Sequence, residues 1–570
     1  MAESTVNPII SVGWPRRTLL WPGLLLVAVI GTMTLTPVLF IFINSFNVAD
    51  PAEEWRFGLE GWREAFESPR TLNAIGYSFL LNLRSLLAIL IAFVFSWLLV
   101  RVRIPLRGFI EFSLWIAYFI PSLPLALSWI LLLDPNYGLL NQLFGTIGIK
   151  LNIYSWYGIV WVHLTASTIP IMTILLAPVF RQMDAALEEA ARVCGAGVSQ
   201  TFRRILVPVL APALLTVLIA AVIRGLEAFQ VELLLGRPAG IYVYATRIYD
   251  LIQWEPPLFP QAMALSSLFL GVLFIFALFY QRYTTKRQFA TISGRGVSFR
   301  PMDIGKGRYA ISAGLLLFVM VAVYLPLAVL VMGSFMRLFG FFHINDPFSL
   351  RHWSVVLNDP VFTSALRNSF VVGIGSAGIG ILIYSLLAYV LVRTSIFGKS
   401  WINMLVWLPW AVPGILLGLA FLWLFLSVPF LTVIYGTFVG LVLVLVIKEM
   451  PIGVHMMKTA LVQVATELEQ VGRICGATWF YTYWRITLPL ISPVLVSIFA
   501  IAFMAAIRDI DTIILIGTSS VRPLSLLMME YSMAGEMQAA SIIGVILSSV
   551  AIGVAFLARR YGFRVGSEAN

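Results

Sequence analysis

The chain has 570 residues, of which 60% are hydrophobic and only 11% are charged. Soluble domains carry about 45–50% apolar and about 25% charged residues, so this composition excludes a soluble protein and indicates one that crosses a membrane many times. The net charge is +11, and we attribute most of it to membrane topology rather than to nucleic-acid binding, since Lys and Arg are retained on the cytoplasmic side.

Hydrophobic runs long enough to cross the hydrocarbon core, which takes about 20 helical residues, recur along the whole chain. They predict an all-α membrane protein with about twelve transmembrane helices, arranged as two tandem halves of six. The predicted spans cover residues 19–44, 74–100, 109–133, 154–180, 209–235, 261–281, 309–334, 365–392, 401–427, 430–457, 490–517 and 536–558. The first run is too long for a signal peptide, so we keep it as a span.

The most polar stretch of the first half covers residues 184–208 and reads EEAARVCGAGVSQTFRRILVP from Glu188 onward. Helix-forming residues precede Gly195, which suits the left-handed position that ends a helix, and Pro208 can open the next span. The pattern predicts a helix, a turn and a second helix across the cytoplasmic face. On pattern alone, an interfacial loop with snorkelling cations explains it equally well.

Ionisable residues recur at membrane depth in corresponding parts of the two halves. They are Arg224, Glu227 and Glu232 in the fifth predicted span, and Arg508, Asp509 and Asp511 in the eleventh. Such groups are costly in a membrane unless they are paired or hydrated, so we place them on a translocation pathway or at its external gate. Pairing within a helix, as between Arg224 and Glu227, is the alternative. Lys448, Glu449 and Arg84 have no partner in the other half and rank lower.

The densest cluster of cations lies between the halves, in residues 282–308. The sequence therefore predicts a first half over 1–281, a basic cytoplasmic linker over 282–308 and a second half over 309–570. Most of the 38 Lys and Arg fall in cytoplasmic segments if both termini lie inside the cell, and we predict that orientation.

The second half repeats the polar stretch over residues 464–489, as EQVGRICGATWFYTYWRITLP from Glu469 onward. Each half has six predicted spans, an even number, so both halves have the same orientation. We therefore expect a parallel pseudo-two-fold axis along the membrane normal. Spans and charges alone also fit a secondary transporter with twelve spans.

The duplicated polar stretch resembles a known loop. The residues that carry the resemblance are Glu189, Ala190, Ala191, Gly195, Ile205 and Pro208. Their spacing is similar to the EAA loop of permease subunits in binding-protein-dependent ABC importers, and residues 229–252 and 522–525 resemble fused permeases of the ferric-iron transport type. The resemblance implies a type I ABC importer fold, in which this loop is the coupling helix that docks on the ATPase.

Carried over to this chain, the resemblance assigns ATPase docking to residues of both copies. They are Glu188, Glu189, Ala190, Ala191, Gly195, Ile205 and Pro208 in the first copy, and Glu469, Gly476, Ile486 and Pro489 in the second. The second copy departs from the pattern, with Gln470, Val471 and Gly472 in place of the EAA residues. Whether both copies dock equally is therefore open.

The resemblance also implies the partners and the location. They are two ATPase subunits that bind ATP and Mg, a periplasmic substrate-binding protein, and the lipid of a bacterial inner membrane; no nucleic acid is expected. We expect a transport subunit without catalytic residues, cofactors or a metal site of its own, because no nucleophile and base can be paired and the four His lack metal-ligand spacing. Ferric iron is the cargo that the resemblance suggests; thiamine, phosphonate and polyamine are the alternatives.

Overall fold

The computed structural model describes residues 20–49, 54–184, 186–286, 301–394 and 398–561. Within these ranges the regular elements are all helices, and extended segments pair only through three isolated bridges. Nine of the described helices are long and apolar enough to cross a membrane, and three bent pairs raise the number of spans to as many as twelve. The predicted all-α fold is therefore confirmed.

The first half supplies six of these spans. Their helices are α1 (Leu20–Asn44), α3 (Pro69–Asn82) with α4 (Arg84–Arg101), α5 (Arg107–Phe119) with α6 (Ser122–Leu133), α8 (Trp156–His163) with α9 (Ile169–Gln182), α12 (Val207–Leu226) and α14 (Phe259–Lys286). The short helices between them are α2 (Glu60–Glu67), α7 (Leu139–Gly145), α10 (Ala186–Val193), α11 (Val198–Thr201) and α13 (Tyr244–Ile252).

The second half follows the same order. Its span-forming helices are α15 (Gly307–Val319) with α16 (Leu325–Phe335), α18 (Pro360–Arg393), α19 (Lys399–Trp407) with α20 (Gly414–Ser427), α22 (Phe438–Gln463), α26 (Ser492–Arg508) and α29 (Met537–Tyr561). The short helices are α17 (Arg351–Asn358), α21 (Pro429–Thr432), α23 (Thr466–Ile474), α24 (Trp479–Thr482), α25 (Leu488–Leu490), α27 (Ile513–Ile516) and α28 (Leu524–Ala534).

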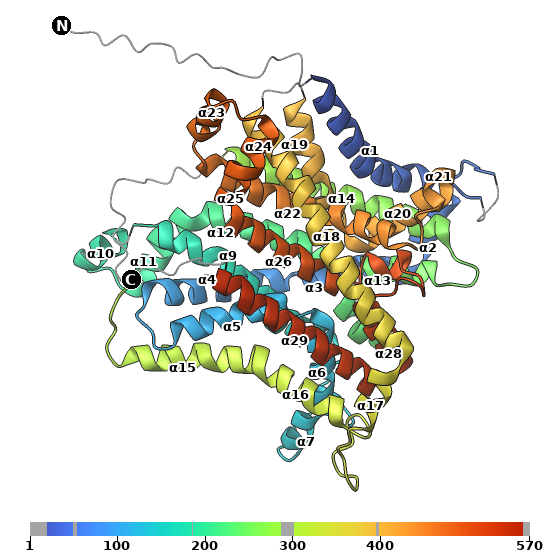
Figure 1. Cartoon of the computed structure of the whole chain (residues 1–570). Helices are drawn as coiled ribbons and strands as arrows, with labels where there is room; N and C mark the ends of the chain where they lie inside the picture. Colours follow the sequence, from blue (N-terminus) through green and yellow to red (C-terminus); the bar gives the residue numbers. More distant parts are fainter. Residues whose placement is uncertain (1–19, 50–53, 185, 287–300, 395–397, 562–570) are drawn as a thin grey trace.

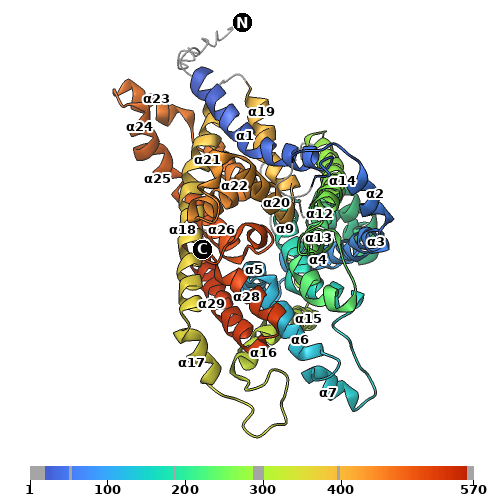
Figure 2. The same ribbon diagram turned by 90° about the vertical axis from the view of Figure 1, so that its right-hand side faces the viewer.

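The first span of each half packs against the other half. α1 packs against α19 and α20 of the second half, while α15 and α16 pack against α5 and α6 of the first. Figure 1 shows α1 beside the second half and α15 beside the first, and Figure 2 shows the same exchange from the side. The two halves are therefore interlocked, and each completes the packing of the other.

The helices that begin the two predicted polar stretches, α10 and α23, lie toward one side of the molecule. In Figure 1, α10 is at the left and α23 at the upper left, whereas α7 and α17 are at the bottom and α21 is at the right. The start of α1 and the end of α29 lie toward the side of α10 and α23. The membrane-spanning helices run between these two sides.

Two spans that the sequence predicts as single helices are broken at equivalent prolines. α5 and α6 meet at 102°, and the helical segments 399–411 and 414–427 meet at 109°. Ile120 and Val412 adopt extended backbone before Pro121 and Pro413, because the proline ring disfavours helical backbone in the preceding residue. Each half therefore carries a bend at the same point of its third span.

The predicted ends of the fifth and eleventh spans, at 235 and 517, are wrong. α12 ends at Leu226 and α26 ends at Arg508, and irregular chain with short helical turns follows each of them. The apolar residues beyond the ends, such as Leu235 and Ile513, are fully buried in the protein itself. Hydrophobicity alone does not distinguish burial against protein from burial in lipid. The sequence therefore predicted both spans to extend beyond the true ends of their helices.

Candidate functional site

The first polar segment (residues 184–208) folds as two helices joined by a tight turn. α10 ends before Gly195, which has a left-handed φ of 79°, and α11 leads without a break into α12. The N–H of Ala196 donates to the carbonyl of Ala191 at 2.9 Å, as in a Schellman cap. The predicted helix, turn and helix, with glycine at the helix end, are confirmed.

The second polar segment (residues 464–489) repeats this turn but continues differently. α23 ends before Gly476, which has a φ of 82°, and the N–H of Ala477 donates to the carbonyl of Gly472 at 2.9 Å. The following helix is bent by 78° at Ile491, where the first half has an unbroken helix from Ser199 to Leu226. The two segments thus share their turn and differ in how they join the membrane-spanning helix.

A buried ion pair ties α10 to the rest of the first half. Arg101, the last residue of α4, places its Nε 3.1 Å from Oε1 of Glu188, and both side chains are almost fully buried. The indole N–H of Trp97 donates to Oε2 of Glu188 at 3.4 Å, and Arg101 also donates to the carbonyl of Met183. The arginine therefore holds both the helix and the chain that enters it.

The second half builds the same tie from equivalent residues. Nε of Arg393, the last residue of α18, lies 3.1 Å from Oε1 of Glu469. The hydroxyl of Tyr389 donates to Oε2 of Glu469 at 2.9 Å, and Arg393 donates to the carbonyl of Val464 at 2.6 Å. The same buried contact occurs in both halves, which indicates that this ion pair fixes the position of each polar segment.

The residues that the sequence assigned to docking divide into two groups. Exposed residues are Glu189, Ala190, Gly195, Pro208, Gly476 and Pro489; buried or half-buried ones are Glu188, Ala191, Ile205, Glu469 and Ile486. Glu188 and Glu469 face their own halves, so their direct role is to hold the segment, and a partner can reach Glu189. At Gly472, an added Cβ would lie 3.2 Å from Ile486 Cδ1, which favours a small residue where α23 packs on the next helix.

The two segments present different surfaces. The second segment exposes six large apolar side chains, which are Leu468, Val471, Ile474, Phe480, Tyr481 and Trp484. On the first segment, Val193 is the most exposed large apolar side chain, at 88%. A partner would therefore meet a largely polar surface on one half and an aromatic, apolar surface on the other.

Six ionisable side chains from both halves gather where α12 and α26 end, and we call them the central charged cluster. They are Arg224, Glu227, Lys448, Arg508, Asp509 and Asp511. Electrostatic interactions link Glu227 to Lys448, and link Asp511 to both of these residues. Segments that are far apart in the sequence therefore bring charged side chains of both halves to one place.

A hydrogen bond between equivalent residues marks the axis that relates the halves. Nε2 of Gln230 donates to Oδ1 of Asp511 at 3.0 Å, and the two residues are 281 positions apart, the same spacing that separates Glu188 from Glu469. Two equivalent residues can touch only close to a two-fold axis. Ser122 donates to Oε1 of Gln230 at 2.8 Å, which fixes the amide that faces Asp511.

Each half also places an arginine on an aromatic ring of the other half. The guanidinium of Arg508 lies 5.2 Å from the ring centroid of Tyr118, whose carbonyl it also reaches at 2.6 Å. The guanidinium of Arg224 lies 5.7 Å from the ring centroid of Trp410. Such cation–π contacts contribute about 0.5–2 kcal/mol each, so this reciprocal pair helps to hold the halves together.

The remaining contacts of the cluster stay within one half. Arg224 pairs with Glu227 at 2.9 Å, so the intrahelical pairing that the sequence left open is confirmed for these two residues. Lys448 pairs with Asp509 and donates to Thr512 Oγ1 at 2.8 Å. Lys448, which the sequence ranked low, is therefore one of the best-connected residues of the cluster.

Glu232 lies apart from the cluster, inside the first half. It is fully buried, with Oε1 at 2.8 Å from Nε2 of His163 and 3.7 Å from the guanidinium of Arg84. Arg84 also donates to the carbonyl of Leu81 at 3.1 Å. Glu232 thus anchors the irregular chain after α12 to α4 and α8.

We predict that Glu232→Ala destabilises the protein without removing it from the membrane. The substitution leaves the buried Arg84 without its counter-charge, and removing one partner of a buried ion pair costs about 3–5 kcal/mol. Thermal unfolding in detergent, followed by size-exclusion chromatography, should show a lowered midpoint. Glu530→Gln is the matched control, because Glu530 pairs with Arg522 at a half-exposed site; an equal loss from both variants would contradict the role of burial.

Over the described ranges, no group of three or more His, Cys, Asp or Glu residues is placed to hold a metal ion.

Sequence reasoning missed several residues that organise these sites. They are Trp97, Arg101, Gln230, Tyr389, Arg393 and Thr512. A signal was present for the arginines, since each ends the span before the bend in its own half. It was overlooked because an arginine at the end of a span is ordinary at a cytoplasmic interface.

Two interlocked halves of six apolar spans, with a duplicated polar segment in each, define a multi-pass membrane transport protein. The family described as binding-protein-dependent transport system inner membrane component matches residues 84–290 and again residues 377–565. These matches cover more than half of the chain, and the chain belongs to this family. It is therefore the inner-membrane permease component of an ABC importer, with both permease domains in one polypeptide.

Individual relatives extend the comparison. The Fe(3+)-transport system permease protein FbpB 2 of Haemophilus influenzae is 23% identical over 96% of this chain and 100% of its own length. The ferric transport system permease protein FbpB of Actinobacillus pleuropneumoniae is 26% identical over 70% of this chain and 58% of its own. A solved bacterial alginate ABC transporter in complex with its periplasmic protein is 18% identical, with a TM-score of 0.38 over 46% of this chain and 95% of its own.

Proposed function

We propose that this chain forms the whole transmembrane pathway of its importer, and that it recruits two ATPase subunits through its two polar segments. A periplasmic binding protein would deliver the solute to the opposite side. ATP hydrolysis belongs to the partner subunits, and the chain contributes the route and the mechanical link. Both termini would lie in the cytoplasm, on the side of α10 and α23.

The duplicated buried tie carries this proposal. In each half an arginine at the end of a membrane-spanning helix holds a glutamate of the short helix, at 3.1 Å in both cases. A movement imposed on α10 or α23 would therefore pass directly to α4 or α18. It would also reach the central charged cluster through α12 or α26, the membrane-spanning helix that follows each polar segment. An interfacial loop that only rests on lipid has no need for two such ties.

The cargo that we propose is ferric iron. The support is that the two relatives above, at 23% and 26% identity, are named for ferric-iron transport. A relative named for molybdate or tungstate transport, from Pyrococcus abyssi, is 27% identical over 35% of this chain, so an oxyanion is the competing class. Uptake of iron against molybdate by proteoliposomes with the cognate binding protein separates the two.

The native cysteines allow a direct test of docking. The chain has two, Cys194 and Cys475, each exposed and each next to the glycine that ends its polar helix. Maleimide labelling, read peptide by peptide by mass spectrometry, should be suppressed at both cysteines when the ATPase binds. The purified complex should contain two ATPase subunits per chain. One subunit per chain, or no protection at either cysteine, contradicts the proposal.

The two segments should tolerate charge differently. Glu189 and Gln470 are both exposed and occupy equivalent positions, so Glu189→Lys and Gln470→Lys form a matched pair. Because only the first change reverses a charge and because the second segment also presents an apolar surface, we predict that Glu189→Lys lowers ATPase co-purification more. Equal losses would show that the difference between the segments has no energetic meaning.

A further inference from the structure

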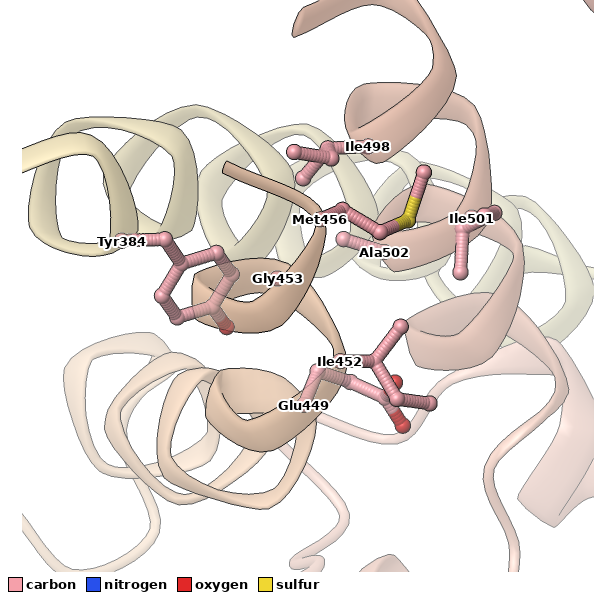
Figure 3. A pocket seen from close by; sticks show the side chains of 8 residues that line it. All are labelled: Tyr384, Glu449, Ile452, Gly453, Met456, Ile498, Ile501 and Ala502. Atoms are coloured by element: carbon pink, nitrogen blue, oxygen red, sulfur yellow. The ribbon is translucent and has the colours of Figure 1, made fainter. Parts of the chain in front are cut away.

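A small cavity lies between α18, α22 and α26, along the stretch of α26 that connects the second polar segment to the central charged cluster (Figure 3). It has a volume of about 10 Å³, enough for roughly one water-sized group. Its lining residues are Tyr384, Glu449, Ile452, Gly453, Met456, Ile498, Ile501 and Ala502. Glu449 is the one residue in this lining that carries a charge.

Glu449 makes no direct hydrogen bond or ion pair with any residue that the structure describes. The nearest cations have other partners: Lys448 is paired with Asp509, Arg224 with Glu227, and Arg508 reaches the carbonyl of Tyr118. A carboxylate at membrane depth is expensive unless it is paired or used. Each of the three acidic side chains in the central charged cluster has a direct partner. The neighbouring Glu449 has none among the described residues.

The walls of the cavity are built to keep this space. A Cβ at Gly453 would lie 2.1 Å from the ring of Tyr384, so only glycine leaves room for the tyrosine at this point of α22. The hydroxyl of Tyr384 donates to the carbonyl of Val446 at 2.7 Å, which fixes the ring. The equivalent of Glu449 in the first half is Thr168, so the carboxylate belongs to one half only.

We propose that Glu449 and this cavity form a transient binding site for a cationic cargo, next to the central charged cluster and on the side of the second polar segment. The inference rests on the proposed transport function and adds a residue to it. A cation leaving the cluster would meet a carboxylate that has no direct partner, in a wall whose other residues carry no charge. A single charge gives an attraction that is strong enough to guide the ion and weak enough to release it.

Transport with a matched pair of variants tests the proposal. Proteoliposomes that contain the permease and its ATPase would receive ferric iron from the loaded binding protein. We expect Glu449→Gln to lower iron uptake about tenfold with the amount of bound ATPase unchanged, Glu449→Asp to restore part of the uptake, and Glu536→Gln, at an exposed carboxylate, to behave as wild type. Wild-type uptake by Glu449→Gln would overturn the proposal. No iron uptake by the wild type would instead refute the proposed cargo.

A second measurement tests whether the cavity attracts cations, and its result does not depend on the identity of the cargo. In a chain with Cys194 and Cys475 replaced by Ser, Met456→Cys supplies a thiol in the cavity wall, and cationic and anionic methanethiosulfonates of similar size compete for it. We expect the ratio of cationic to anionic reaction rates to fall about tenfold on adding Glu449→Gln. In a separate control chain that keeps native Cys475 and carries Cys194→Ser without Met456→Cys, the ratio measured at Cys475 should not change on adding Glu449→Gln. An unchanged ratio at position 456, or no reaction there with either reagent, would overturn the proposal.

Discussion

Replacing Arg101 or Arg393 by Met should detach the corresponding polar segment and strip the complex of ATPase, while the protein remains in the membrane. Each change leaves a buried glutamate without its counter-charge, Glu188 or Glu469, at a cost of about 3–5 kcal/mol. A loss of that size exceeds a factor of 10² in the population of the docked segment. We expect ATPase co-purification to fall about tenfold or more in each variant.

The control for this prediction lies two residues along the chain. Arg103 is exposed, so Arg103→Met removes the same charge without touching Glu188 and should retain ATPase at wild-type level. Combining Arg101→Met with Glu188→Met removes the stranded carboxylate as well, and we expect recruitment to recover in part, because apolar replacement of a whole buried pair is often neutral. If the single and double variants lose ATPase equally, the arginine contacts the partner itself and the tie is not structural.

Much of the architecture could be predicted from the sequence. Composition alone identified a multi-pass membrane protein, the polar repeat identified two equivalent halves, and glycine before each turn located the helix ends at Gly195 and Gly476. These features depend on local chemistry: apolar length sets a span, and a left-handed residue sets a turn. These local rules hold in any protein, so both features could be predicted without knowing which distant segments pack against them.

The contacts between distant segments could not be predicted in this way. Gln230 is neutral and lies in an apolar stretch, and only the interlocking of the halves places its amide 3.0 Å from Asp511. Lys448 was ranked low for a related reason, since its partner Asp509 lies directly after another helix, α26. The sequence grouped Glu232 with Arg224 and Glu227, because hydrophobicity could not show that the helix before it ends at Leu226 and that its partners are His163 and Arg84.

Linking Gln230 to Asp511 across the axis should stop transport. Both would be replaced by Cys in a chain with Cys194→Ser and Cys475→Ser, then joined by a short bis-methanethiosulfonate, since their side chains lie 3.0 Å apart. A pathway between two halves related by an axis has to open along that axis, so a covalent link there prevents the separation. We expect uptake to fall to background after cross-linking and to return when a reductant cleaves the link.

A link of the same kind within one half should be harmless, and the chain offers one. Gln261, which is half-buried, donates to a carboxylate oxygen of the exposed Glu64 at 2.6 Å within the first half. The pair Glu64→Cys and Gln261→Cys therefore repeats the chemistry of Gln230 and Asp511 away from the axis. Uptake by this control should survive the reagent. Because each variant is compared with itself before and after cross-linking, the loss of the original hydrogen bond cancels from the comparison. Full uptake by the chain linked between positions 230 and 511 would mean that the halves do not part at the central charged cluster, and that the route lies elsewhere.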